Sequence, residues 1–195
     1  TQLYKVKENH YRLVVIDQIL GKYPDNKPDR VTQLFAKKYK GKHKARVFVY
    51  GDPSGNAEDK QYFKVIRNNL STPTYLKNQL KAIGRSHEIN DFKVEVRAGK
   101  SIFFVVQRGM FINTLLEGEI AGGLTLELVI HPHCSEVIED YEQVLEDTDG
   151  TKLKVKVTDE ATGRKYEERG HCTDAMDYLI CRMFIEYYDR FRKLL

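Results

Sequence analysis

The sequence predicts an α/β protein, and three observations support this class. A run rich in β-branched residues (residues 11–23) is followed by a helical pattern and then by a second apolar run (residues 45–51). Strand, helix and strand joined by short connections are typical of a parallel pair in an α/β sheet. The chain has 195 residues, of which 41% are hydrophobic, so residues 1–195 are predicted to form a single domain with a proper core.

The first helix is predicted from the spacing of its apolar residues. These recur at helical intervals between Val31 and Tyr39, and Gly41 stops the pattern. The run 45–51 is then predicted to be a buried strand, paired in parallel with the strand 11–23. After the turn that follows it, residues 61–70 are predicted to be helical.

A further helix is predicted at residues 72–84. Thr72 can cap it, Pro73 suits its first position, and Gly84 ends it. Residues 92–99 alternate in polarity and are predicted to form a strand.

The second half of the chain is also predicted to contain both helices and strands. It is predicted to contain a helix at 101–118, a strand at 124–132, a helix at 135–145, a projecting β-hairpin at 151–169 and one long helix at 172–195.

Composition excludes several classes of protein. The formal net charge of +4 is too small to indicate a nucleic-acid partner by itself. The cysteines Cys134, Cys172 and Cys181 are too few for a disulfide scaffold and suit a reducing compartment. No apolar run approaches the ~20 residues of a membrane span, and no secretory leader is expected.

Two aspartates occupy positions that α/β enzymes use for chemistry. Asp52 follows the apolar strand, at its carboxyl end, and Asp174 falls in the first turn of the last predicted helix. Each has a simpler explanation, because Asp52 could start a turn and Asp174 or Thr173 could cap the helix. Taken together, the two can converge at the edge of one sheet.

Such a pair suits hard divalent cations. Mg²⁺ and Mn²⁺ prefer carboxylate oxygens, and two ions ~3.5–4 Å apart can cleave a phosphodiester. His171 could bind metal or shuttle a proton. Because like charges repel, neutralising Asp52 or Asp174 is expected to stabilise the metal-free protein slightly. Two metals normally need a third carboxylate.

Several stretches resemble one protein family. The sequences "VVIDQI", "VFVYGDPSGNA", "HPHCSEVIEDYEQV" and "HCTDAMDYL" are similar, in family order, to the nuclease domain of bacteriophage large terminase subunits. The resemblance covers most of residues 11–183. It implies a ribonuclease H-like mixed sheet flanked by helices, with Asp52 and Asp174 as metal ligands and His171 beside them.

The sequence departs from the family at one position. The family has an earlier aspartate at the end of its first strand, which should precede Tyr11, and residues 1–10 contain none. The first strand is therefore expected to be missing or altered, with Asp17 a possible substitute. The family's ATPase motor is not expected in this chain, because the Gly that should precede Gly99-Lys100-Ser101 is Val94.

Basic residues are the candidates for DNA contact. The candidates are Lys42 and Lys44 before the Asp52 strand, and Lys154, Lys156 and Arg164 in the predicted hairpin. In the resembled nucleases a comparable hairpin lies near the active site. A solvated helix end is the simpler explanation of the first group.

Histidines and cysteines could suggest a zinc site. His131, His133 and Cys134, together with His171, Cys172 and Cys181, have spacings that fit none of the usual zinc patterns, which favours a structural role.

The resemblance implies a function. It is metal-dependent cleavage of double-stranded DNA, with low sequence specificity, during phage genome packaging in the host cytoplasm. The implied partners are an ATPase domain of the same polypeptide, a portal protein and a small terminase subunit, with no membrane. Two alternatives stay open: a non-catalytic DNA-binding or docking module, and another ribonuclease H-like nuclease such as a junction resolvase.

Overall fold

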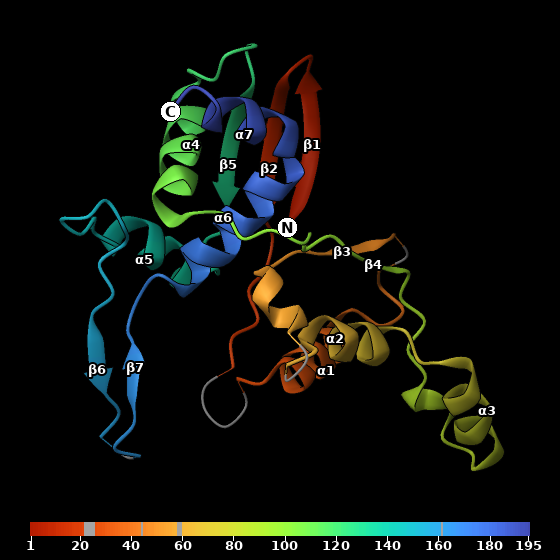
Figure 1. Ribbon diagram of the computed structural model, residues 1–195. Helices are drawn as coiled ribbons and strands as arrows, with labels where there is room; N and C mark the ends of the chain where they lie inside the picture. The colour runs from red at the N-terminus through yellow and green to blue at the C-terminus, as the bar shows by residue number, and fades with distance from the viewer. Residues whose placement is uncertain (22–25, 44, 58–59, 161) are drawn as a thin grey trace. The chain divides into compact units, whose positions relative to one another are not determined.

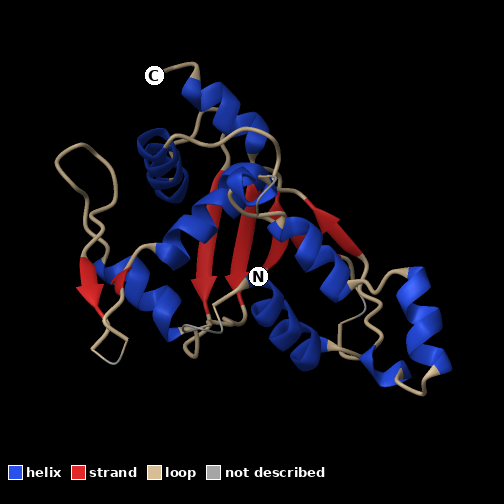
Figure 2. Ribbon diagram, turned by 60° about the horizontal axis from the view of Figure 1, so that its bottom comes forward, coloured by secondary structure: helices blue, strands red, loops and turns tan. Residues whose placement is uncertain are grey.

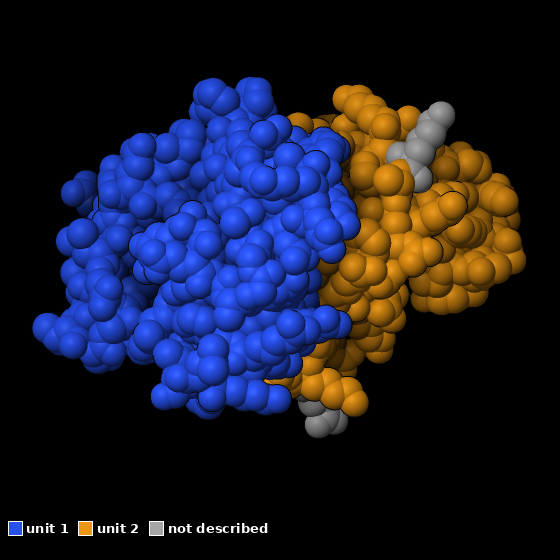
Figure 3. Space-filling model, turned by 90° about the horizontal axis from the view of Figure 1, so that it is seen from above, with its two compact units in different colours: residues 1–18, 102–195 blue, residues 19–101 orange. Residues whose placement is uncertain are grey.

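The computed structural model describes residues 1–21, 26–43, 45–57, 60–160 and 162–195 (Figure 1). The chain forms two compact units, which Figure 3 colours separately. Unit 1 combines Thr1–Gln18 with Ile102–Leu195, and unit 2 is Ile19–Ser101. The single domain predicted from chain length and hydrophobic content stays a prediction about how the chain folds.

Unit 1 is built on a mixed sheet. Its strands are β1 (Gln2–Lys7), β2 (His10–Val15) and β5 (Thr125–Ile130), in the order β1-β2-β5. β1 runs antiparallel to β2, and β2 runs parallel to β5 (Figure 2). A mixed sheet flanked by helices confirms the predicted α/β class.

The sequence analysis missed β1. A turn signal was present in the sequence, because Asn9 stands between two short β-rich runs and asparagine is common in turns. In the structure Asn9 adopts a left-handed φ of 55°. All six residues of β1 are exposed, so the strand has no buried face that would require a regular alternation of apolar and polar residues. The position before Tyr11 therefore holds a strand, and this strand carries no aspartate.

Two predictions about strands were wrong. β2 ends at Val15, whereas a strand through residue 23 was predicted, and residues 22–25 lie outside the described part. β2 pairs with β1 and β5 on its two sides, whereas a parallel partner at 45–51 was predicted. That run forms β3 (Val47–Val49), which pairs in parallel with β4 (Val94–Val96) in a separate two-stranded sheet.

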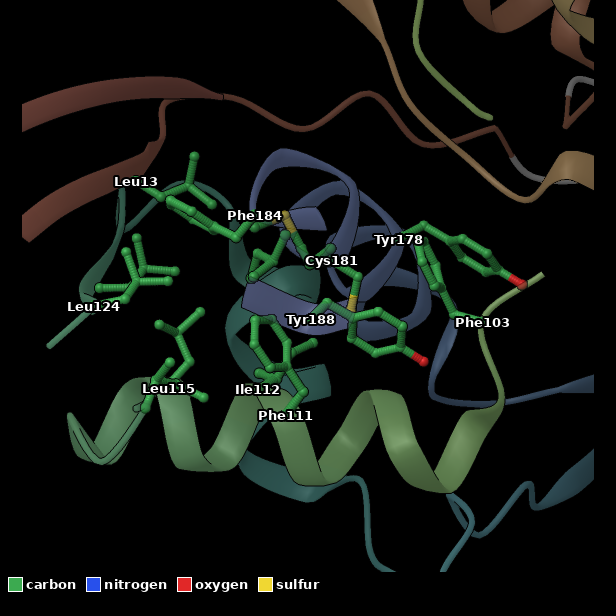
Figure 4. Close-up of a cluster of buried hydrophobic side chains, with 14 of the residues drawn as sticks. Leu13, Phe103, Phe111, Ile112, Leu115, Leu124, Tyr178, Cys181, Phe184 and Tyr188 are labelled. Carbon is green, nitrogen blue, oxygen red and sulfur yellow. The ribbon is translucent and has the colours of Figure 1, made fainter. Parts of the chain in front are cut away.

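One face of the unit 1 sheet forms the core. Leu13 and Leu126 are buried there, and the helix α4 (Val105–Glu117) packs over them. Figure 4 shows Phe111 and Leu115 pointing from α4 into this cluster. Burying each such side chain contributes about 1.5–3 kcal/mol, so this face carries most of the hydrophobic stabilisation of unit 1.

The opposite face of the sheet is polar. His10 Nε2 and Arg12 Nε each lie 2.6 Å from the carboxylate of Glu127 on the neighbouring strand. The alternation of apolar and charged residues along β2 and β5 thus separates core from solvent.

The C-terminal segment forms two helices, although one was predicted. These are α6 (His171–Met183) and α7 (Ile185–Arg192), and Phe184 between them has a non-helical ψ of 37°. Phe184 is buried, and its ring meets that of Tyr11 edge-on at 5.3 Å between centroids. Packing against the sheet therefore overrides the helical pattern at this residue.

The remaining elements of unit 1 follow the predictions closely. α5 (Ser135–Gln143) is slightly shorter than expected. β6 (Lys156–Thr158) and β7 (Lys165–Glu167) form the predicted antiparallel hairpin, with shorter arms, and it extends away from the sheet (Figure 1).

Unit 2 is smaller and mostly helical. It contains α1 (Pro28–Tyr39), the 3-10 helix η1 (Pro53–Asn56), α2 (Tyr62–Leu70), α3 (Thr74–Ala82) and the 3-10 helix η2 (Ser86–Glu88). Its core is formed by Ala36, Leu70 and Phe92.

Thr72 does not cap α3 as predicted. Pro73 is the N-cap residue, and the Thr72 hydroxyl instead accepts a hydrogen bond from the backbone N–H of Asn90 at 2.9 Å. Across both units, no helix within the described residues has the length and apolarity needed to cross a bilayer.

Candidate functional site

The site begins at the N-terminus of α6, which a buried carboxylate from another helix caps. Asp140 of α5 is 4% exposed and accepts hydrogen bonds from the backbone N–H groups of Gly170, Cys172 and Thr173 at 3.0, 2.8 and 3.2 Å. Gly170 has a φ of +96°, which suits glycine. Because Asp140 satisfies these donors, Asp174 is not needed as a cap, and its side chain is used elsewhere.

Asp174 is surrounded by three cations. Its Oδ1 accepts from Arg108 Nη2 at 2.7 Å and from Lys152 Nζ at 3.2 Å, and its Oδ2 accepts from Lys154 Nζ at 2.8 Å. Arg108 comes from α4, and the two lysines come from the segment that leads into the hairpin.

A second carboxylate joins this group one helical turn later. Asp177 Oδ2 lies 2.5 Å from Lys152 Nζ and 3.3 Å from Arg108 Nε. Arg108 and Lys152 thus bridge both carboxylates. Five residues therefore form a charge cluster: Arg108, Lys152, Lys154, Asp174 and Asp177.

The pKa values of the two carboxyl groups in the charge cluster are shifted in opposite directions. Burial alone would raise the pKa of Asp174, but Lys154, Lys152 and Arg108 outweigh it and hold that pKa below its ordinary value. Asp177 is more deeply buried, and burial raises its pKa although Lys152 and Arg108 favour its ionised form. Asp174 is therefore the more firmly ionised of the two at neutral pH.

Arg108 is the centre of the cluster, and the sequence analysis missed it. Its side chain is 3% exposed, and its guanidinium lies 4.6 Å from the centroid of the Tyr178 ring. A single arginine within an apolar helix was the available signal. Asp177 was also missed, although its spacing of three residues from Asp174 places both on one helix face.

Asp52 has a different environment, in unit 2. It is the N-cap residue of η1, and its Oδ1 accepts from the backbone N–H of Ser54 at 2.8 Å. The side chain is exposed and follows β3, as predicted. These contacts fit the turn explanation, and a site shared by Asp52 and Asp174 stays a prediction.

His171 is exposed at the first position of α6. Among the hydrogen bonds and ion pairs of the described residues, none involves its ring. A metal or proton-transfer role for His171 stays a prediction, as does its association with Asp52.

The proposed DNA-contacting residues fall into two groups. Lys42, Lys156 and Arg164 are exposed, the first in the turn after α1 and the others in the hairpin region, while Lys44 lies outside the described residues. Lys154 differs, because its ammonium pairs with Asp174 and lies 3.2 Å from Glu167.

Asp17 lies just beyond the carboxyl end of β2, beside the residues that follow β5. Its Oδ1 is 3.5 Å from Nε2 of His133, and the rings of His131 and His133 are 4.1 Å apart. Within the described part of the chain, no three His, Cys, Asp or Glu residues form a group that could hold a metal ion.

The charge cluster offers two hard oxygen donors to a cation. The Lys152 ammonium lies between Asp174 and Asp177, so a cation already occupies the point where their carboxylates converge. This donor set fits one Mg²⁺ or Mn²⁺ ion, provided that the lysine moves away. A second ion would need further carboxylates, and Asp52 is the candidate from the sequence.

Comparison with protein-family models finds no family that matches the chain, and the searches of curated proteins and of solved structures also find no match. The resemblance to terminase nuclease domains therefore stays a hypothesis that rests on the motifs around Asp52 and Asp174.

Proposed function

We propose that this chain is a metal-dependent endonuclease that cuts double-stranded DNA with low sequence specificity during phage genome packaging, on a ribonuclease H-like fold. The observation that carries the proposal is the pair of carboxylates, Asp174 and Asp177, held together with three cations at the start of one helix. Carboxylates that bind a metal next to cations that bind phosphate are what phosphodiester cleavage requires.

The cations give the cluster a way to respond to DNA. Lys152 and Lys154 are partly exposed, so a backbone phosphate can compete with the carboxylates for their ammonium groups. Arg108 is buried and stays with Asp174 and Asp177. Binding of phosphate would thus free carboxylate oxygens at the moment when the substrate arrives.

Asp174 and Asp177 would hold the ion, and the resemblance implies Asp52 as a further ligand. A bound Mg²⁺ or Mn²⁺ would activate a water molecule and stabilise the leaving oxygen. Low sequence specificity follows because contacts to phosphate carry no base information.

Plasmid cleavage in Mn²⁺ tests the proposal. Asp174→Asn should abolish nicking, and Asp52→Asn should do the same if both carboxylates act in one site. Asp189→Asn on α7 is the matched control, because it removes an aspartate whose side chain is half exposed and lies 3.9 Å from Arg192, outside the charge cluster. Wild-type activity in Asp174→Asn would exclude the proposed role of this residue.

A non-catalytic DNA-binding module is the second candidate. It is favoured by the three cations that neutralise Asp174 in the metal-free protein. In that case the wild-type chain should shift DNA in a gel without cutting it, and Lys152→Ala with Lys154→Ala should weaken the shift.

A further inference from the structure

A pocket of about 510 Å³ opens in unit 1, beside the charge cluster. It lies between α4, the end of α5 and the loop that follows α5. The volume falls within the ~300–1,000 Å³ typical of binding sites. Its apolar lining residues include Val105, Val106, Met110, Leu116, Val144 and Leu145.

The apolar side chains at the pocket mouth are unusually exposed. Val106, Met110 and Leu145 are 38%, 45% and 64% exposed. Single exposed apolar residues are ordinary, but a contiguous group around a concavity marks an interaction site.

The loop wall of the pocket is preformed. The backbone N–H of Leu153 donates to the carbonyl of Leu145 at 2.8 Å, and the N–H of Asp147 donates to the carbonyl of Thr151 at 2.7 Å. Gly150 has a φ of +78° and lies against Val106. A wall fixed by these bonds loses little entropy when a partner binds.

Acidic residues are concentrated near Leu145 in the sequence, although the whole chain carries a formal +4. Glu146 lines the pocket and is exposed, and the exposed residues Glu142, Asp147 and Asp149 lie within four positions of Leu145 in the chain. The charged groups deeper in the pocket are already engaged, because Lys152 pairs with Asp177, and Asp140 caps α6. The complementary partner is therefore apolar and basic.

One polar side chain that lines the pocket lacks a hydrogen-bond partner for its hydroxyl among the described residues. The hydroxyl of Tyr141, which lines the pocket, is buried and has no hydrogen-bond partner within the described residues. It can donate to a backbone carbonyl of an inserted segment, which would remove the cost of its isolation.

We propose that this pocket is a docking site for a segment of another protein, an amphipathic helix that inserts an apolar side chain and carries lysine or arginine beside it. Insertion of one helix face into an apolar groove is a common mode of recognition. The inference does not depend on the proposed nuclease activity.

Fluorescence anisotropy with a labelled amphipathic peptide of leucine and lysine tests this docking site. The intact chain should bind the peptide, and Met110→Ser combined with Leu145→Ser should weaken binding about tenfold, since a few anchor contacts carry most of the affinity. Glu146→Lys should weaken it several-fold, and Glu8→Lys, which changes the net charge equally on an exposed residue of β1's turn, should not.

Controls separate docking from adhesion. Leu194→Ser removes an exposed leucine outside the pocket and should leave affinity unchanged. A peptide with serine in place of leucine should not bind. The proposal is overturned if that peptide binds equally, if no peptide binds, or if the pocket variants bind as the wild type does while their thermal melting is unchanged. Sedimentation showing a dimer that Met110→Ser with Leu145→Ser dissociates would assign the pocket to a second copy instead.

Discussion

Asp52 and Asp174 carry the same carboxyl group, and their surroundings differ in almost every respect. Asp52 is exposed and accepts one backbone hydrogen bond from Ser54, two residues along the chain. Asp174 is half-buried and meets cations from α4 and from the segment before the hairpin. The hydrogen bond from Ser54 to Asp52 is local, whereas the three cations that converge on Asp174 come from distant parts of the chain and need a tertiary explanation.

The largest effect should come from the arginine that distinguishes the two sites. Arg108→Met should destabilise the chain by about 3–5 kcal/mol, because it leaves Asp177 buried and short of a partner. Arg97→Met on β4's exposed end, where Arg97 pairs with Glu95, should cost under about 1 kcal/mol. Urea unfolding of both variants measures the difference, and equal losses would mean that Arg108 serves only as packing.

Neutralising Asp174 should come next in size. Asp174→Asn should lower the free energy of unfolding by about 1–3 kcal/mol at neutral pH, since it leaves Arg108 with less compensation. This reverses the expectation from the sequence that neutralisation stabilises the protein. That expectation assumed neighbouring carboxylates, and the neighbours are mostly cations. A higher melting temperature for Asp174→Asn would restore the earlier view.

The loss caused by Asp174→Asn should depend on pH. The folded-state pKa of Asp174 is lowered, so its charge stabilises the fold above its ordinary pKa of about 4. This contribution is lost as the pH falls through the lowered pKa. The wild type and Asp174→Asn should therefore converge in stability as the pH falls below the ordinary pKa of aspartate, and a pH series of chemical denaturations checks this. The pKa of Asp177 is raised and not lowered, so Asp177→Asn should not show the same loss of stability with falling pH.

The smallest effect is expected at Asp52. Asp52→Ala removes the cap of η1 and should cost about 0.5–1 kcal/mol, while Asp52→Ser should restore most of it, because serine also caps. Thermal melting of the two variants is sufficient. A much larger loss in both would indicate that Asp52 has a role beyond its turn.

The α/β class and most of the elements could be predicted from the sequence, although β1 and the break at Phe184 could not. The length of the apolar run at residues 101–118 predicted α4. Helical spacing predicted α1 closely, because an amphipathic stripe depends only on residues a few positions apart. The hairpin β6–β7 and the position of Asp174 in a first helical turn were predicted for the same reason. Local chemistry is sufficient wherever the partners lie close in the chain.

The pairing of these elements and the surroundings of the aspartates could not be predicted from the sequence. β2 could pair with any strand of suitable pattern, and the selection of β1 and β5 follows from burying Leu13 and Leu126 on one face. The break at Phe184 reflects its contact with Tyr11, far away in the sequence. Arg108 and Asp174 are 66 residues apart, and no local pattern records that a buried guanidinium will need a carboxylate from another helix.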